Sequence, residues 1–123
     1  MTNKTFEELE IWRTGIDLVH DLWKIFYSKS FRNFDFQSQI MRAAISITNN
    51  IAEWFERWTR KEFSLFLYYA KWSCGEVRSM LYSAKKFGYI DEKFFSETKN
   101  KCINLSVKIY NLIKYLKEKN KKQ

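Results

Sequence analysis

The chain has 123 residues, of which 46% are hydrophobic and 19% aromatic, and it carries a formal charge of +8 with three glycines and no proline. Such a composition excludes a disordered chain, and the shortage of turn-forming residues excludes β-sandwiches, barrels and glycine-rich nucleotide folds. We therefore expect one all-α domain over residues 1–123, an antiparallel up-down four-helix bundle, with a lysine-rich tail over 119–123.

The location of the protein and the state of its two cysteines follow from what the sequence lacks. No stretch of 18 apolar residues is free of charge, and the N-terminal residues show no apolar secretion segment, so we expect a cytoplasmic protein. Cys74 and Cys102 lie in helical sequence without a C-x-x-C motif. This favours two reduced, buried thiols over a disulfide or a metal site.

Two amphipathic helices are predicted in the first half of the chain. Thr5 and Glu8 form a capping-box pattern, and a helix of five to six turns follows with an apolar stripe at Leu9, Trp12, Ile16, Val19, Trp23 and Phe26. Polar residues over 28–35 predict a connection. The second helix presents a stripe with small neighbours that permit close packing, at Ile40, Ala44, Ile47, Ile51 and Phe55.

Two longer helices are predicted in the second half. A second capping box over 59–62 predicts a tight hairpin between helices two and three, and Gly88 has the position of a C′ residue that ends helix three. Asp91 is the expected N-cap of the fourth helix. The inward stripes are Phe63, Phe66, Leu67, Ala70, Cys74, Val77, Leu81 and Ala84 in the third helix and Phe95, Cys102, Leu105, Ile109, Leu112 and Leu116 in the fourth.

The third helix carries a second apolar face. At 100° per residue, Leu65, Trp72 and Ser79 lie opposite the inward stripe and are flanked by Tyr68 and Tyr69. A monomer would expose this face to water, and a contiguous exposed apolar patch usually marks an interface. The sequence therefore predicts a homo-oligomer.

Catalytic and cofactor-binding patterns are scarce. His20, the one histidine, belongs to no metal-binding or catalytic motif, and we find no P-loop, no G-x-S-x-G and no Cys-His pair at defined spacing. Glu53, Glu62 and Glu76 are interpreted as surface ion-pair or capping residues. We expect no catalytic residue, cofactor or metal, and hence no enzyme.

Basic residues interleaved with aromatic ones give an alternative prediction, a nucleic-acid-binding module. The second half of the chain holds most of the excess positive charge, and a lysine-rich helix end also serves solubility. Contacts to RNA or DNA would be electrostatic, with no base-reading motif and no membrane partner. The candidate residues are Arg57, Arg60, Lys61, Lys71, Arg78 and Lys85.

Several segments together resemble the four-helix-bundle proteins encoded by intervening sequences in bacterial 23S ribosomal RNA genes. The resemblance runs from about residue 6 to residue 117 and implies an up-down bundle that assembles as a ring, often a pentamer, without established catalysis. The chain is also similar to accessory proteins of diversity-generating retroelements, which implies a basic pentamer that binds nucleic acid and a reverse transcriptase. The matching segments are Phe6–Trp12, Gln37–Ile47, Asn50–Glu53, Arg60–Phe63, Phe66–Leu67, Ser73–Glu76 and Leu81–Ile90.

Three tryptophans depart from that family pattern. Trp54 and Trp72 stand where the family usually has glycine, and Trp58 stands at a generally small or basic position. We interpret the three as deliberate additions to an engineered variant, made to form a contact between subunits or an apolar pocket. The alternative is that they only fill gaps in the bundle or extend from its surface. The predicted interface therefore comprises Leu65, Tyr68, Tyr69, Trp72, Trp54 and Trp58.

Overall fold

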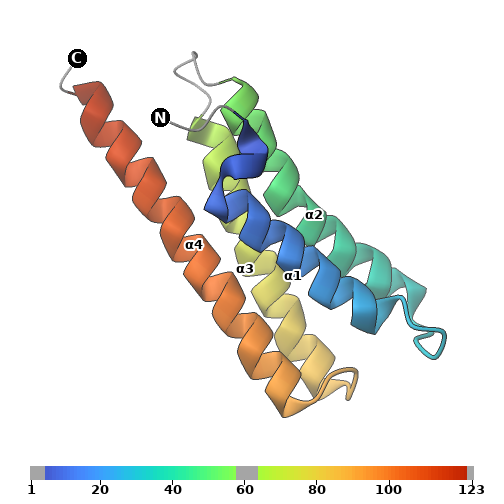
Figure 1. Cartoon of the computed structure of the whole chain (residues 1–123). Coiled ribbons are helices and arrows are strands. Elements are labelled where there is room, and N and C mark those ends of the chain that lie inside the picture. The colour runs from blue at the N-terminus through green and yellow to red at the C-terminus, as the bar shows by residue number, and fades with distance from the viewer. Residues whose placement is uncertain (1–4, 58–63, 122–123) are drawn as a thin grey trace.

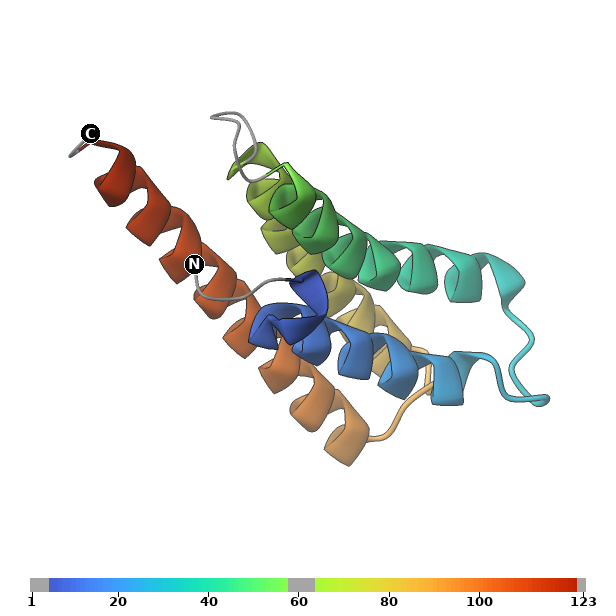
Figure 2. The ribbon, with the colours of Figure 1, turned by 45° about the horizontal axis from the view of Figure 1, so that its top comes forward.

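The computed structural model describes residues 5–57 and 64–121, which form four helices after a single 3-10 turn, η1 (Phe6–Glu8). Consecutive helices run in opposite directions in both views (Figures 1 and 2). α1 and α3 each pack against both α2 and α4, which completes a four-helix bundle and confirms the predicted fold. The helices are α1 (Glu10–Phe26), α2 (Phe34–Glu56), α3 (Ser64–Lys86) and α4 (Glu92–Lys121).

The bundle core contains the predicted inward stripes of α2, α3 and α4. Ile40, Ala44, Ile47 and Ile51 are buried in α2, and the predicted α3 residues from Leu67 to Ala84 are buried together with Ser73, which was not predicted. The predicted Phe55 and Phe66 are half-buried. In α4 the stripe continues through Ile113, which the sequence pattern had not included. Within the described ranges, no helix is long and apolar enough to cross a membrane.

The predicted stripe of α1 was wrong in phase. Ile16 and Trp23, which the pattern directed inward, are 39% and 51% exposed. Leu9, just before the helix, and Phe26 are buried as predicted, but the other buried residues of α1 are Ile11, Gly15, Leu18 and Leu22, which the pattern had not included. The helix carries two neighbouring apolar stripes with the same period, so periodicity alone could not decide which of them faces the core.

Gly15 explains why the second stripe of α1 is the inward one. A Cβ atom built at Gly15 would lie 2.7 Å from the Cγ2 methyl of Thr48 on α2, well inside ordinary contact distance. The missing side chain therefore lets α1 and α2 approach closely at this point. The predicted stripe was chosen from large apolar residues only, so it did not include Gly15.

The predicted start of α1 was also wrong. The Thr5 side chain makes no capping hydrogen bond; the chain forms η1, extends at Leu9 and enters α1 at Glu10. The cap of α2 is Asn33, whose side chain accepts a hydrogen bond of 3.0 Å from the Phe36 backbone N–H. The second predicted capping box, over residues 59–62, lies outside the described residues, as does Phe63.

The connection between α3 and α4 follows the prediction closely. Gly88 has φ +78°, and the Tyr89 N–H donates to the Ala84 carbonyl at 2.8 Å while the Gly88 N–H donates to the Lys85 carbonyl at 3.0 Å. This is a Schellman motif, which favours glycine at the left-handed position. The Asp91 carboxylate then accepts from the Phe94 N–H at 2.8 Å and caps α4.

Candidate interaction surfaces

The outer face of α3 presents aromatic side chains to solvent. Trp72 is 56% exposed, and its ring centroid lies 5.6 Å from that of Tyr69 and 6.1 Å from that of Tyr68. Leu65 is also exposed, whereas Tyr68 is half-buried. We call these four residues the outer α3 face. Trp72 points away from the core, as its helical phase predicted.

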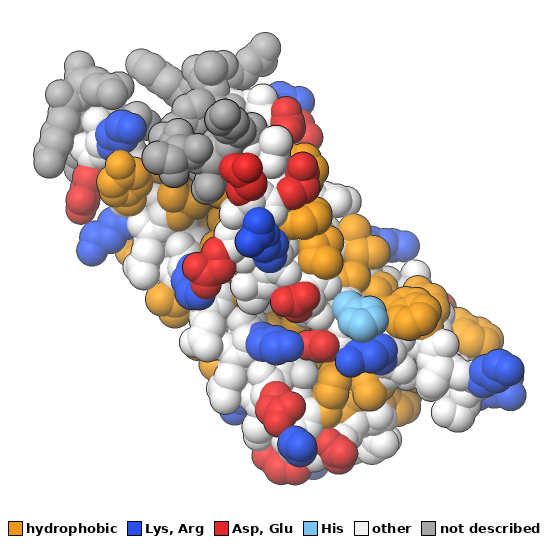
Figure 3. Space-filling view, viewed as in Figure 1, with side chains coloured by type: hydrophobic (Ala, Val, Ile, Leu, Met, Phe, Trp, Pro, Cys, Tyr) orange, Lys and Arg blue, Asp and Glu red, His pale blue; other side chains and the backbone are white. Residues whose placement is uncertain are grey.

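A second exposed apolar surface lies on the α1 side of the bundle. Ile16, Trp23 and Tyr27 from the α1 region and Ile45 from α2 are all exposed, and we call them the outer α1 face. The Trp23 ring stacks on His20 with centroids 6.1 Å apart. Figure 3 shows hydrophobic side chains gathered beside the histidine on the face of the molecule that carries α1.

The outer α1 face borders a hollow on the surface of α2. Tyr27, Met41 and Ile45 line it together with Arg42 and with serine and asparagine side chains, and its volume is about 470 Å³. The aromatic ring of Tyr27 and the aliphatic side chains give one side of the hollow an apolar wall. The two apolar faces of the molecule therefore differ in shape, since one carries a projecting indole and the other lies beside a depression.

The tryptophans of the predicted interface do not gather in one place. Trp54 has no exposed surface and packs in the core of its own chain, so the assignment of Trp54 to an interface is corrected. Trp54 lies three residues after the buried Ile51, on the same side of α2, so its helical phase predicts burial. The interface prediction rested only on the glycine that the family usually has at this position. Trp72 lies on the surface, and Trp58 lies outside the described residues.

Lysines and aromatic rings alternate where α3 packs against α4. Four lysine Nζ atoms lie over aromatic rings at cation–π distances: Lys71 over Tyr110 at 5.9 Å, Lys85 over Phe95 at 4.5 Å, Lys99 over Phe95 at 5.0 Å and Lys117 over Tyr68 at 5.1 Å. A hydrogen bond to the Tyr68 hydroxyl raises the pKa of Lys117. We define the α3–α4 seam as Lys71, Arg78, Lys85, Lys99 and Lys117.

The six predicted nucleic-acid-binding residues have different surroundings. Arg57 forms an ion pair with Glu53 at 2.6 Å, and Lys85 forms one with Glu92 at 2.6 Å. Lys71 and Arg78 lie on the α4 side of α3 and form no ion pair with any described residue. Arg60 and Lys61 lie outside the described residues.

The sequence prediction missed the contribution of α4 to this seam. Lys99 and Lys117 are 18 residues apart, which is five full helical turns, so they lie on the same side of α4. That spacing was available in the sequence. Which neighbouring helix the lysines would face was not, because it depends on how the four helices pack.

The opposite side of α4 is electrostatically different. Lys101 pairs with Asp21 of α1, and Lys108 pairs with Glu10 of α1. Figure 3 shows acidic and basic side chains interspersed over α1 and α4 on this side. In the α3–α4 seam, by contrast, Glu92 is the one acidic group in an ion pair with a seam cation among the described residues.

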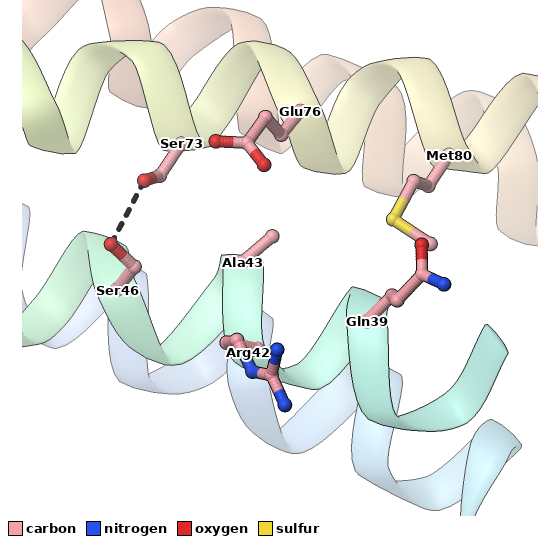
Figure 4. Close-up of a pocket in the computed structure, with 7 residues that line it drawn as sticks. All are labelled: Gln39, Arg42, Ala43, Ser46, Ser73, Glu76 and Met80. Carbon is pink, nitrogen blue, oxygen red and sulfur yellow. Dashed lines mark hydrogen bonds between the residues drawn. The ribbon is translucent and has the colours of Figure 1, made fainter. Parts of the chain in front are cut away.

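A polar hollow of about 470 Å³ opens at the surface between α2 and α3 (Figure 4). The Ser73 hydroxyl donates a hydrogen bond of 3.0 Å to the Ser46 hydroxyl, and the small side chain of Ala43 leaves the space open. Figure 4 shows Arg42 extending away from α3, on which Glu76 lies. The hollow therefore brings no set of like-charged groups together around one point.

Metal-binding geometry is not found in the described ranges, where no group of three or more His, Cys, Asp or Glu side chains could hold an ion. Cys74 and Cys102 are both buried, as predicted, and are not joined in a disulfide. Burial raises the pKa of each thiol from 9.0 to about 12. Both are therefore protonated and uncharged at neutral pH.

The helical architecture and the exposed faces define a small all-α bundle protein of the four-helix class. Residues 7–111 match the model of the 23S rRNA-intervening sequence protein family, a match that includes α1, α2, α3 and most of α4. The chain belongs to this family, as the resemblance of its segments predicted. No curated protein matches the chain.

Proposed function

We propose that the protein is a non-catalytic interaction protein that assembles with copies of itself through the outer α3 face and the outer α1 face. The observation that carries the proposal is Trp72, more than half exposed beside Tyr69 and Tyr68. Exposed aromatic residues of this kind are costly in water and are enriched at the centres of interfaces. A second copy would cover them.

The two faces are unlike, and this favours a head-to-tail contact. An isologous contact uses the same patch on both partners, whereas a head-to-tail contact joins different patches and generates a ring if the rotation closes. Trp72 of one copy would insert toward the hollow beside Tyr27 and Ile45 of the next. Five copies, the number implied by the family resemblance, would together carry a formal charge of +40.

Light scattering combined with size-exclusion chromatography tests the assembly. The full chain should elute with several times the 15.0 kDa mass of one copy. Trp72→Ala should weaken association by about 2 kcal/mol, roughly thirtyfold in the dissociation constant, with little change in protomer folding. The matched control is Tyr115→Ala, an equally exposed aromatic on α4 outside both faces. A 15.0 kDa species at micromolar concentration would contradict the proposal.

We infer a second candidate function, binding of single-stranded nucleic acid along the α3–α4 seam. The supporting observation is the row of five cations with one paired acid, interleaved with aromatic rings. Such an arrangement suits a phosphate backbone with stacked bases. Gel retardation of a labelled oligonucleotide should be strong at low salt and fall steeply as salt rises. No retardation at micromolar protein would reject this function.

A further inference from the structure

A small hollow opens in the middle of the α3–α4 seam. Its volume is about 220 Å³, and its lining comes from two helices: Lys71, Trp72, Cys74, Gly75 and Arg78 from α3, and Cys102 and Ser106 from α4. It lies between the seam cations Lys71 and Arg78, which are seven residues, or about two turns, apart on one helix.

The groups around this hollow all favour an anion. Arg78 forms no hydrogen bond, ion pair or ring contact with another described residue, so its donors are available. Ser106 adds a hydroxyl that likewise has no partner in the described ranges. Trp72 carries an indole N–H, which can only donate a hydrogen bond. The thiols of Cys74 and Cys102 stay protonated and so place no negative charge at the floor. Lys71 and Arg78 both act electrostatically on the Cys74 thiol, which places their charges near it.

Gly75 keeps the hollow open. A Cβ atom built at this position would meet no atom within 4 Å, so the glycine is not needed for helix packing. Glycine in a helix interior is unfavourable by up to about 1 kcal/mol relative to alanine. The position therefore gives up helix stability and leaves space for a group from outside the chain.

We propose that this hollow is a phosphate-binding subsite, in which Arg78, Lys71 and the Ser106 hydroxyl hold one phosphate group of a nucleic-acid strand lying along the α3–α4 seam. Arg78 supplies a planar fork of donors that matches phosphate oxygens, and Lys71 supplies a point charge. The inference rests on the second candidate function. It adds that binding is concentrated at one built position instead of being spread evenly over the cations.

Two probes test the subsite in the full-length protein. In the first, inorganic phosphate is titrated at constant ionic strength while the backbone amide resonances of the three glycines are followed by NMR. The Gly75 resonance should shift and saturate, whereas Gly15, between α1 and α2, and Gly88, in the α3–α4 turn, should not move. In the second, the affinity for a labelled single-stranded oligonucleotide is measured by fluorescence anisotropy.

Three variants distinguish binding at this one site from a general effect of positive charge on affinity. Arg78→Gln should weaken binding about tenfold, the loss expected for a charge-assisted contact. Gly75→Leu, which fills the hollow with a good helix former, should weaken it similarly while the helical circular dichroism is retained. The matched control is Lys86→Gln, which removes the same charge from an exposed α3 residue outside the hollow. It should change affinity less than threefold.

The outcomes distinguish the subsite from nucleic-acid binding as such. A Gly75 shift that depends on Arg78, without oligonucleotide binding, would support a site for free phosphate and reject the nucleic-acid function. Oligonucleotide binding that depends on Arg78 and Gly75 supports the subsite for a phosphodiester, with or without a response to inorganic phosphate. If Arg78→Gln and Gly75→Leu match Lys86→Gln in both measurements, the subsite is overturned, and any binding that remains is spread over the seam.

Discussion

The outer α1 face and the outer α3 face are both exposed and apolar, but they differ in position and shape. Ile16 and Trp23 lie about 100–120° around α1 from the middle of its buried stripe, whereas Trp72 lies about 160° around α3 from the middle of the buried stripe of that helix. The α1 face adjoins a hollow, and the α3 face projects an indole. Unlike surfaces on one chain are what a head-to-tail assembly requires.

Replacing the buried Trp54 should cost much more stability than replacing either of the exposed residues Trp23 and Trp72. Trp54→Ala should lower the free energy of unfolding by about 3–5 kcal/mol, because the residue is fully buried and its removal leaves a cavity. Trp23→Ala and Trp72→Ala should each change protomer stability by less than about 1 kcal/mol. Urea unfolding at a protein concentration low enough for every variant to be monomeric measures all three, because association would otherwise add to the apparent stability. A loss near that of Trp54→Ala for either exposed residue would place it in the core.

Gly15 tests whether α1 is held in its observed phase by contact with α2. Gly15→Ala should destabilise the bundle by about 1–3 kcal/mol, because the new methyl meets the stiff, buried Thr48 side chain. Thermal unfolding monitored by circular dichroism measures the loss. The double variant with Thr48→Ser should recover most of it, since serine keeps the hydroxyl and lacks the clashing Cγ2. Unchanged stability in Gly15→Ala would argue that Ile16 and Trp23 can face the core.

A substitution at Gly75 should change stability in the opposite direction from Gly15→Ala, and by less. Gly75→Ala meets no neighbouring atom and should raise the free energy of unfolding by about 0.5–1 kcal/mol through helix propensity and a less flexible unfolded chain. The same thermal unfolding experiment measures the gain. A loss of stability would mean that α4 packs closer to α3 than the open space at Gly75 indicates.

Most of the fold could be predicted from the sequence because three helices each have one dominant inward stripe. The signals at Gly88 and Asp91 were strong because a left-handed glycine and an N-cap carboxylate depend on local backbone geometry alone. α1 was harder, since its two adjacent apolar stripes together form one wide apolar arc. The choice between them depends on the close contact of Gly15 with Thr48, a residue 33 positions away.

The candidate surfaces could be predicted only in part. The phase of Trp72 was sufficient to place it outside, because residues on one helix determine it. The ion pair of Arg57 with Glu53 joins residues four apart at the C-terminal end of α2, so it could be predicted from the sequence. The ion pair of Lys85 with Glu92 could not, because it joins two helices across the α3–α4 turn. The seam as a whole depends on which side of α4 faces α3, and that is a property of the packed bundle.

The central claim is that copies of the chain associate through two unlike faces, and a mixing experiment tests it most directly. Trp72→Asp removes the α3 contact and Trp23→Asp removes the α1 contact, so each variant alone should sediment as a 15.0 kDa monomer. An equimolar mixture retains one intact contact, between the α1 face of the first variant and the α3 face of the second, and should form a dimer that cannot extend. A mixture that remains monomeric, or either variant alone assembling like the unmodified chain, would contradict the account.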